Sequence, residues 1–234
     1  MRFALPTRRP FATPARPRRQ LALYAALLLP ATSHAAGGHH AVDDAAILDV
    51  GECQVETWVE RQAGDQLLHL GPACRVLGME AGLHVDRIRL GRQTAPGVAG
   101  VQLKWAQELQ PGLSVGALWS ADWQHGSPGQ ASQILLLPLT WQPHATLALH
   151  LNIGREFRPQ AADRTRHGLA VEWQPNAQWQ LLAEQWRDAV EPQRRLGLRF
   201  FATERLSLDV SRATRLCAQR PARWALGVNW SFAR

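Results

Sequence analysis

The chain has 234 residues, of which 46% are hydrophobic and ten are tryptophan, and its formal net charge is +7. Six of its 26 basic residues lie in the first 35 positions, which contain no acidic residue. The remaining chain is therefore close to electrical neutrality. This excludes the strongly basic surface of a nucleic-acid-binding protein, and we expect no nucleic acid partner.

Residues 1–35 have the layout of a cleaved export signal. Arginines such as Arg8 and Arg9 precede the apolar run LALYAALLLPA, and Ser33 and Ala35 occupy the small-residue positions before a cleavage site. The apolar run is too short to span a bilayer as a helix. We expect cleavage after Ala35, an N-terminal segment over residues 36–51 and a β-barrel domain over residues 52–234.

From residue 52 onward, apolar and polar residues alternate with a period of two. In LALHLNI, Leu147, Leu149 and Leu151 would share one face of an extended strand, and His150 and Asn152 the other. The alternation predicts twelve strands, over residues 52–61, 66–77, 79–90, 99–109, 113–124, 132–142, 145–155, 167–174, 178–187, 194–202, 205–213 and 223–232.

The number of strands depends on the second and third segments. Gly71, Pro72 and Gly78 interrupt the alternation there, so ten strands is the fallback. Short links such as QPNAQ alternate with longer ones such as GREFRPQAADRTRHG, as in bacterial outer-membrane barrels, whose strand number is even. We therefore predict an all-β fold, an up-and-down antiparallel transmembrane β-barrel.

The tryptophans and the polar faces favour a membrane barrel over a soluble one. Trp173 and Trp179 flank the link QPNAQ, where two indoles would meet at one membrane–water boundary. Ionic residues such as Lys104, Glu172 and Asp209 lie on the polar faces, and a wet lumen accommodates them. The alternative is a soluble periplasmic barrel or sandwich that binds a ligand, with the apolar faces inside.

The last strand, WALGVNWSFAR, resembles the C-terminal recognition signal that outer-membrane barrels present to their assembly machinery. Gly227, Trp230 and Phe232 fill the glycine and the two hydrophobic positions of that signal. The match departs at Ala225, where a polar residue is usual, and at the two residues that follow Phe232. The resemblance implies a location in the outer membrane. In a closed barrel the last strand must pair with the first, so that no edge is left.

The chain as a whole is similar to small uncharacterised proteobacterial outer-membrane barrels, in particular to outer-membrane proteins of the phenol meta-cleavage pathway. The similarity rests on GHHAVDDAAILDVGECQVETW, in which Cys53 and Trp58 open the first strand, and on LGVNWSF at the end. It implies a fold and a location, and it brings no catalytic residues.

Three cysteines in an exported chain make one disulfide the expected arrangement. Cys53 and Cys74 flank a predicted hairpin and are the preferred pair. The rival pair joins Cys53 to Cys217, which requires the first and last strands to be neighbours.

A candidate metal site lies in GGHHAVDD, where His39, His40, Asp43 and Asp44 offer two imidazoles and two carboxylates. The segment lacks rigid support, so a solvated N-terminal stretch without metal is the alternative that we favour. We expect no cofactor.

The chain offers little for catalysis. Ser120, His125 and His150 are the residues that a lipase or acyltransferase could use, but no G-x-S-x-G motif is present and their spacing does not indicate a triad. We expect no enzyme. A pore for small solutes is the preferred function, and a closed structural barrel without transport is the alternative.

The longest predicted loop is rich in arginine. It contains Arg155, Arg158, Arg164, Arg166 and His167, and arginine forks suit phosphate. One interpretation is contact with lipopolysaccharide phosphates. The other is a solvated loop balanced by neighbouring acidic residues.

Overall fold

The computed structural model describes residues 39–126, 132–159, 161–188, 191–217 and 220–234. These residues belong to one compact unit, Ser33–Arg234. The predicted export signal lies outside the described residues. Among the residues that are described, no helix is long and apolar enough to cross a membrane.

The described residues form twelve long strands and one short strand. Their bounds are β1 (Glu52–Gln62), β2 (Asp65–Val76), β3 (Met79–Leu90), β4 (Gln93–Thr94), β5 (Val98–Gln110), β6 (Leu113–Gln124), β7 (Ser132–His144), β8 (Leu147–Phe157), β9 (Arg164–Asn176), β10 (Trp179–Asp188), β11 (Pro192–Thr203), β12 (Leu206–Arg215) and β13 (Arg223–Ala233).

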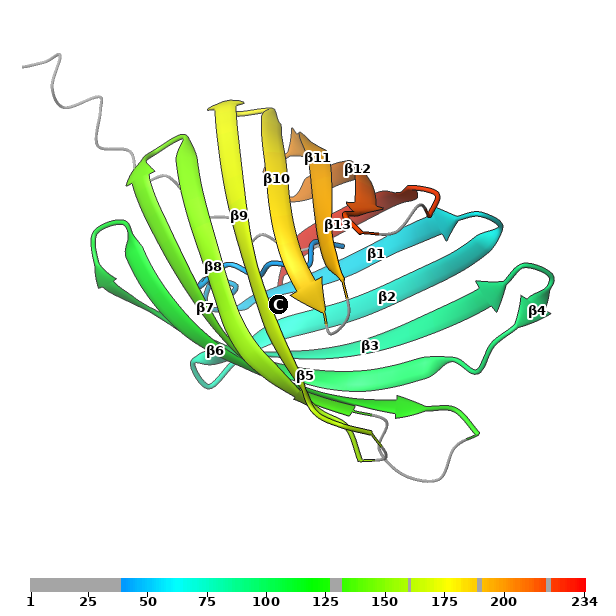
Figure 1. Cartoon of the computed structure of the whole chain (residues 1–234). Coiled ribbons are helices and arrows are strands. Elements are labelled where there is room, and N and C mark those ends of the chain that lie inside the picture. Colours follow the sequence, from blue (N-terminus) through cyan, green and yellow to red (C-terminus); the bar gives the residue numbers. More distant parts are fainter. Residues whose placement is uncertain (1–38, 127–131, 160, 189–190, 218–219) are drawn as a thin grey trace, which may run out of the picture. The chain divides into compact units, whose positions relative to one another are not determined.

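The long strands close into an antiparallel barrel (Figure 1). Each pairs with the next along the chain, and β1 also pairs with β13, from Glu52 opposite Ala233 to Arg61 opposite Trp224. The two-residue β4 pairs only with the end of β3. Closure leaves no long strand with an unpaired edge, which is the condition for a sheet in lipid. The prediction of twelve strands is confirmed, and β2 and β3 are intact despite their glycines.

The links between strands differ at the two ends of the barrel. Two-residue links join β2 to β3, β5 to β6, β7 to β8, β9 to β10 and β11 to β12 at the end where Glu52 and Ala233 also lie, which we call the turn end. The other links between long strands lie at the opposite, loop end, and all but Ala63–Gly64 are longer, the link from β3 to β5 containing the short strand β4. Leu77 and Gly78 have φ of 50° and 80°, as a tight hairpin turn requires.

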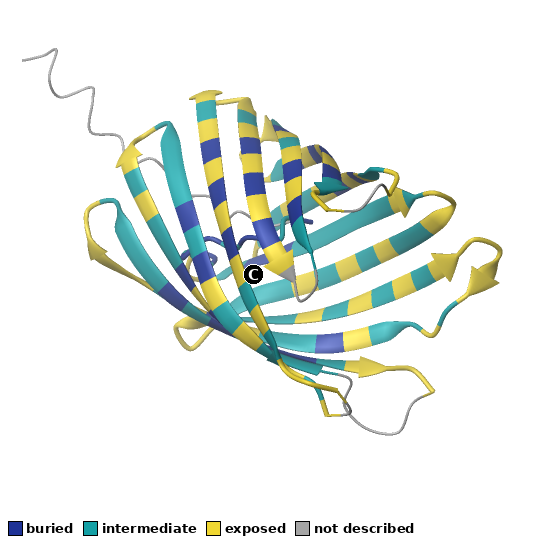
Figure 2. Cartoon of the chain, viewed as in Figure 1, coloured by how far each residue is buried: buried dark blue, intermediate teal, exposed yellow. Residues whose placement is uncertain are grey.

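The barrel is apolar outside and polar inside. Exposed and buried residues alternate along its strands, as the bands along β9 to β11 in Figure 2 show. On β13, Leu226 is 60% exposed and Trp230 52%, whereas Ala225 is 2% exposed. On the inner face, Glu172, Arg199 and Asp209 are all buried. A soluble barrel has the reverse arrangement. The outward apolar face is therefore suited to lipid, as the sequence predicts.

Outward tryptophans mark both ends of the apolar face. Trp141, Trp173 and Trp230 are exposed near the turn end, and Trp123 and Trp224 near the loop end. Such rows correspond to the aromatic girdles of membrane barrels. Trp186 is an exception, because it is buried on the inner face of β10.

The disulfide joins Cys53 of β1 to Cys74 of β2, which lie directly opposite each other in the strand register. The preferred pairing is therefore confirmed. The rival pairing with Cys217 is wrong, because Cys217 is free and exposed.

The arginine-rich loop is shorter than predicted. Strand β8 continues to Phe157 and β9 begins at Arg164, so Arg155 and Arg166 lie on strands. The sequence did not indicate these strand ends because polar residues occupy both faces there.

Candidate functional site

Residues 39–48, which we call the lumenal segment, lie inside the barrel before β1 begins (Figure 1, blue). Their backbone groups form hydrogen bonds with inward side chains of several strands. Amide nitrogens of Ala41 and Val42 donate to the carboxylate of Glu184 on β10, at 3.0 and 2.9 Å. The amide of Asp43 donates to Asn152 on β8, whose side-chain nitrogen donates back to the Asp43 carbonyl, both at 2.7 Å. The preference for a solvated N-terminal stretch was therefore wrong.

The other end of the lumenal segment is attached in the same way. Thr140 on β7 accepts from the amide of Ala45 at 2.7 Å, and Glu80 on β3 accepts from the amide of Leu48 at 3.1 Å. Arg75 donates to the carbonyl of Leu48 at 3.0 Å. Anchors on both halves of the barrel hold the segment across the lumen.

Buried ion pairs support these anchors. Arg195 on β11 lies 3.1 Å from Glu184 and 3.0 Å from Glu60, and it donates to the carbonyl of His39. Lys104 on β5 donates to Asp44 of the segment at 2.8 Å. Because each charge has a partner of opposite sign, the segment lies in the barrel without an isolated buried charge at these points.

Apolar packing adds a further contact. Val42 is buried against Ala170, Trp186 and Ala213, which form an apolar patch on the inner wall. The lumen is otherwise ionic, but this patch gives it an apolar surface that is complementary to the side chain of Val42.

His39 is buried and uncharged at neutral pH. Burial, followed by the positive charges of Arg195, Arg199 and Arg223, lowers its pKa from 6.5 to about 3. Its Nε2 lies 2.6 Å from Oγ of Ser211 on β12. A protonated imidazole at this position would face three guanidinium groups.

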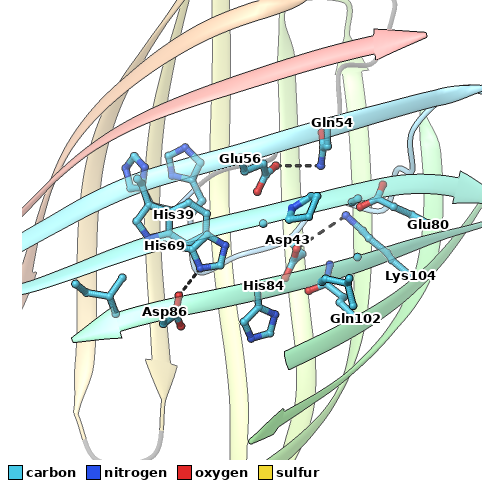
Figure 3. Close-up of a pocket in the computed structure, with 18 of the residues that line it drawn as sticks. His39, Asp43, Gln54, Glu56, His69, Glu80, His84, Asp86, Gln102 and Lys104 are labelled. Atoms are coloured by element: carbon cyan, nitrogen blue, oxygen red, sulfur yellow. Dashed lines mark hydrogen bonds and ion pairs between the residues drawn. The ribbon is translucent and has the colours of Figure 1, made fainter. Parts of the chain in front are cut away.

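The lumenal segment separates two cavities. The larger has a volume of about 350 Å³ and the smaller about 170 Å³, and His40, Asp43 and Gln102 line both. The larger lies against β1, β2, β3 and β5 (Figure 3). Its lining is acidic, with one lysine, Lys104, against five carboxylates: Asp43, Glu56, Glu60, Glu80 and Asp86.

Stacked rings cross the wall of the larger cavity. The Trp58 ring on β1 stacks on the His69 ring on β2, with ring centroids 3.5 Å apart. The His84 ring on β3 follows, with its centroid 5.7 Å from that of His69. Nδ1 of His69 lies 2.6 Å from Asp86, and Nε2 of His84 lies 3.0 Å from Asp122. The carboxylates fix the orientation of both imidazoles, so the wall presents rigid polar groups to a solute.

Sequence reasoning found only part of this site. It placed Lys104, Glu172 and Asp209 on the polar faces but did not identify their partners: Lys104 pairs with Asp44, and Asp209 pairs with Arg199. It missed Glu184 and the His69–Asp86 pair, and no local motif marks them, because their partners lie on other strands or in the lumenal segment.

The structure does not bring the four candidate metal ligands together as a metal site. His39, His40, Asp43 and Asp44 lie in the lumen, but Asp43 and Asp44 face Lys104, at 3.9 and 2.8 Å. Among the described residues, no group of three or more His, Cys, Asp or Glu side chains could hold a metal ion.

The three residues considered for catalysis do not form a triad in this structure. Ser120 is buried in the wall of the smaller cavity, and His125 is exposed beyond the end of β6. His150 lies 2.9 Å from the hydroxyl of Thr140 and 3.6 Å from Glu172.

The last strand has the orientation that its pattern predicts. Leu226, Val228 and Trp230 point outward, while Gly227 is buried and Asn229 donates to Asp209 on the inner face at 2.5 Å. Phe232 contacts Trp230, with ring centroids 4.9 Å apart. Recognition by an assembly machinery stays a prediction.

Comparison with known families gives one match that covers most of the chain. The sequence model described as Uncharacterised conserved protein UCP029691 matches residues 24–232. The chain belongs to this family. A search of curated proteins gives no match.

Solved structures show which barrels this member of the family resembles. The KdgM porin has a TM-score of 0.65 at 12% identity, covering 76% of this chain and 99% of that one. The NanC porin has a TM-score of 0.57 at 11% identity, and the match covers 76% of this chain and 98% of that one. Outer membrane phospholipase A from Escherichia coli has a TM-score of 0.53 at 10% identity, and the match covers 75% of this chain and 95% of that one. At these identities the likeness shows a shared fold, that of the outer-membrane porin-like barrels.

Proposed function

We propose that the protein is an outer-membrane channel for small polar solutes that are neutral or positively charged, with the lumenal segment as its constriction. The observation that carries the proposal is the inverted barrel, whose apolar face is outside and whose ionic lumen holds cavities on both sides of the segment. Polar wall groups can replace part of the hydration shell of a passing solute. The turn end, with its short links, would lie in the periplasm.

The charge of the larger cavity supports the choice of solute. A structure similar to this one, at 14% identity and a TM-score of 0.63, is the KdgM porin in complex with oligogalacturonate, a polyanion. Here five carboxylates line the larger cavity. Lys104 lies 3.9 Å from Asp43, and Arg195 and Arg223 lie 3.0 and 3.3 Å from Glu60. Acidic groups still outnumber the basic groups beside them, which disfavours anions by like-charge repulsion in a low-dielectric wall. A link to the phenol meta-cleavage pathway stays a prediction from sequence resemblance.

A planar bilayer experiment tests the proposal. Purified protein should give discrete single-channel steps, and a tenfold KCl gradient should give a reversal potential of the sign expected for cation passage. Discrete steps with anion preference would contradict the solute class. A correctly folded barrel without conductance would contradict the channel itself.

The second candidate is a closed structural barrel. The anchoring of residues 39–48 favours this candidate. The segment fills part of the lumen, and hydrogen bonds to Glu184, Asn152, Thr140 and Glu80 hold it there. The same bilayer recording distinguishes the two, because a structural barrel stays silent.

A further inference from the structure

The outward-facing charges of the barrel are confined to the loop end, and they are all arginine. On the described strands, the exposed residues of the outer face include no Asp, Glu or Lys; the charged residues there are Arg61, Arg87, Arg89, Arg155, Arg187, Arg194 and Arg212. Each lies within a few residues of the loop end of its strand. The outer face near the turn end carries tryptophans instead.

Two grooves on this surface are lined by the arginines. One, of about 310 Å³, is formed by Gln66, Leu68, Arg87, Arg89, Arg92 and Thr94. The other, of about 390 Å³, includes Arg61, Arg89, Asp65 and Trp224. Arg89 lines both, so the grooves adjoin. Each combines guanidinium groups with an exposed apolar side chain, Leu68 or Trp224.

The arginines of the grooves form no ion pairs with the described residues, although Asp65 lines one of the grooves. Within the described part of the chain, Arg61, Arg87, Arg89 and Arg92 have no carboxylate partner, and the nearby carboxylate of Asp65 accepts from the amide of Gly91 at 3.0 Å. Holding several guanidinium groups together without anions is unfavourable. An external anion bound among these guanidinium groups would lower the cost of their mutual repulsion.

We infer that Arg61, Arg87, Arg89 and Arg92 bind the phosphate groups of an outer-leaflet lipid of the lipopolysaccharide type, with Leu68 and Trp224 in contact with its acyl chains. Arginine presents paired N–H donors that fit phosphate oxygens, and its stem can extend from the apolar band to the headgroups. Near the membrane interface an outward arginine costs much less free energy than at the bilayer midplane. The inference rests on the proposed membrane location and not on solute passage.

The same chemistry extends around the barrel. Arg212 lies over the ring of Trp224 at 5.8 Å, and Arg155 lies over Phe157 at the same distance. Arg155 is already paired with Asp163 at 3.0 Å. The groove at β1 to β4 is therefore a stronger phosphate site than the predicted β8–β9 loop.

Binding of diphosphoryl lipid A to the full-length protein in neutral detergent tests the inference, with native mass spectrometry as the readout. The double variant Arg87→Gln/Arg89→Gln should weaken binding at least tenfold. The matched control, Arg205→Gln/Arg234→Gln, removes two exposed arginines at the turn end and should leave it unchanged.

Two further arms identify the ligand chemistry. Lipid A without phosphates should bind wild-type protein at least tenfold more weakly, and 10-fold excess inorganic phosphate should not displace diphosphoryl lipid A. Heat-modifiable gel migration verifies that each variant is folded, and an unfolded variant is replaced by Arg92→Gln. Equal binding by folded variant and wild type, or equal binding of both lipids, would overturn the inference, whatever the bilayer recordings give.

Discussion

At the scale of the residue, the lumenal segment depends on a histidine that is held neutral. His39 lies among Arg195, Arg199 and Arg223, and its contact with Ser211 does not require a charge. Docking of the lumenal segment lowers the pKa of His39, so the imidazole binds a proton more tightly when the segment is released from the wall. Docking is therefore linked to pH through this side chain.

We expect acid to loosen the lumenal segment. The contribution of His39 to docking is fully present above pH 6.5 and is lost as the pH falls from 6.5 toward 3. The loss is on the order of 2 kcal/mol at pH 5. Single-channel conductance should increase between pH 7.5 and pH 4.5, and His39→Asn, which stays neutral, should show a smaller increase.

His144→Asn is the control for this experiment, because His144 is exposed at the turn end. The conductance of His144→Asn should respond to pH as that of the wild type does, because protonation of carboxylates affects the two proteins equally. The same pH response in His39→Asn and wild type would show that His39 does not control docking.

At the scale of the element, the lumenal segment and the barrel wall fit closely at Val42. A Cβ atom added at Gly168 on β9 would lie 2.6 Å from Cγ2 of Val42 and 3.1 Å from Cβ of Trp186. At Gly197 on β11 the nearest atoms would be 3.4 Å away, in His40 and Ser211. The inner wall therefore has glycine at a position where Val42 leaves no room for a Cβ atom.

Gly168→Ala should displace the segment. Overpacking of this kind costs about 1–3 kcal/mol, and release of the segment is the easiest way to relieve it. Amide hydrogen exchange of residues 39–48 should accelerate severalfold in Gly168→Ala and stay near the wild-type rate in Gly197→Ala. Equal protection in the two variants would mean that the wall and not the segment adjusts.

At the scale of the whole molecule, closure depends on the pairing of β1 with β13. Cys53 is opposite Phe232 at the turn end of this seam. Cys53 also bonds to Cys74, so the disulfide staples β1 to β2 directly beside the seam. The last strand thus closes against a stapled hairpin, which presents a pre-formed edge to it.

Phe232→Ala should lower the outer-membrane level of the protein severalfold, because it removes the final hydrophobic residue of the proposed assembly signal. Phe157→Ala, which truncates an exposed outward aromatic residue at the loop end of β8, serves as the control. Heat-modifiable migration of membrane fractions measures folded barrel in both. Normal levels of Phe232→Ala would contradict the proposed signal.

The sequence predicted the barrel well because a two-residue period reports directly which face of a strand is apolar. It located β3 and β6 to the residue, and it paired Cys53 with Cys74 from their positions in one hairpin. The lumenal segment could not be predicted in this way. Its contacts with Asn152 and Glu184 join residues more than 100 positions apart, and GGHHAVDD itself has no period.

The attachment of the lumenal segment has a consequence for any solute that enters the barrel. Leu48 is separated from the start of β1 at Glu52 by three residues, so the segment is a tethered competitor for the inner wall. A short tether gives an effective concentration on the order of millimolar. A solute that uses the same carboxylates must displace this internal ligand, so passage should be selective for abundant solutes or for those that bind more tightly than the segment.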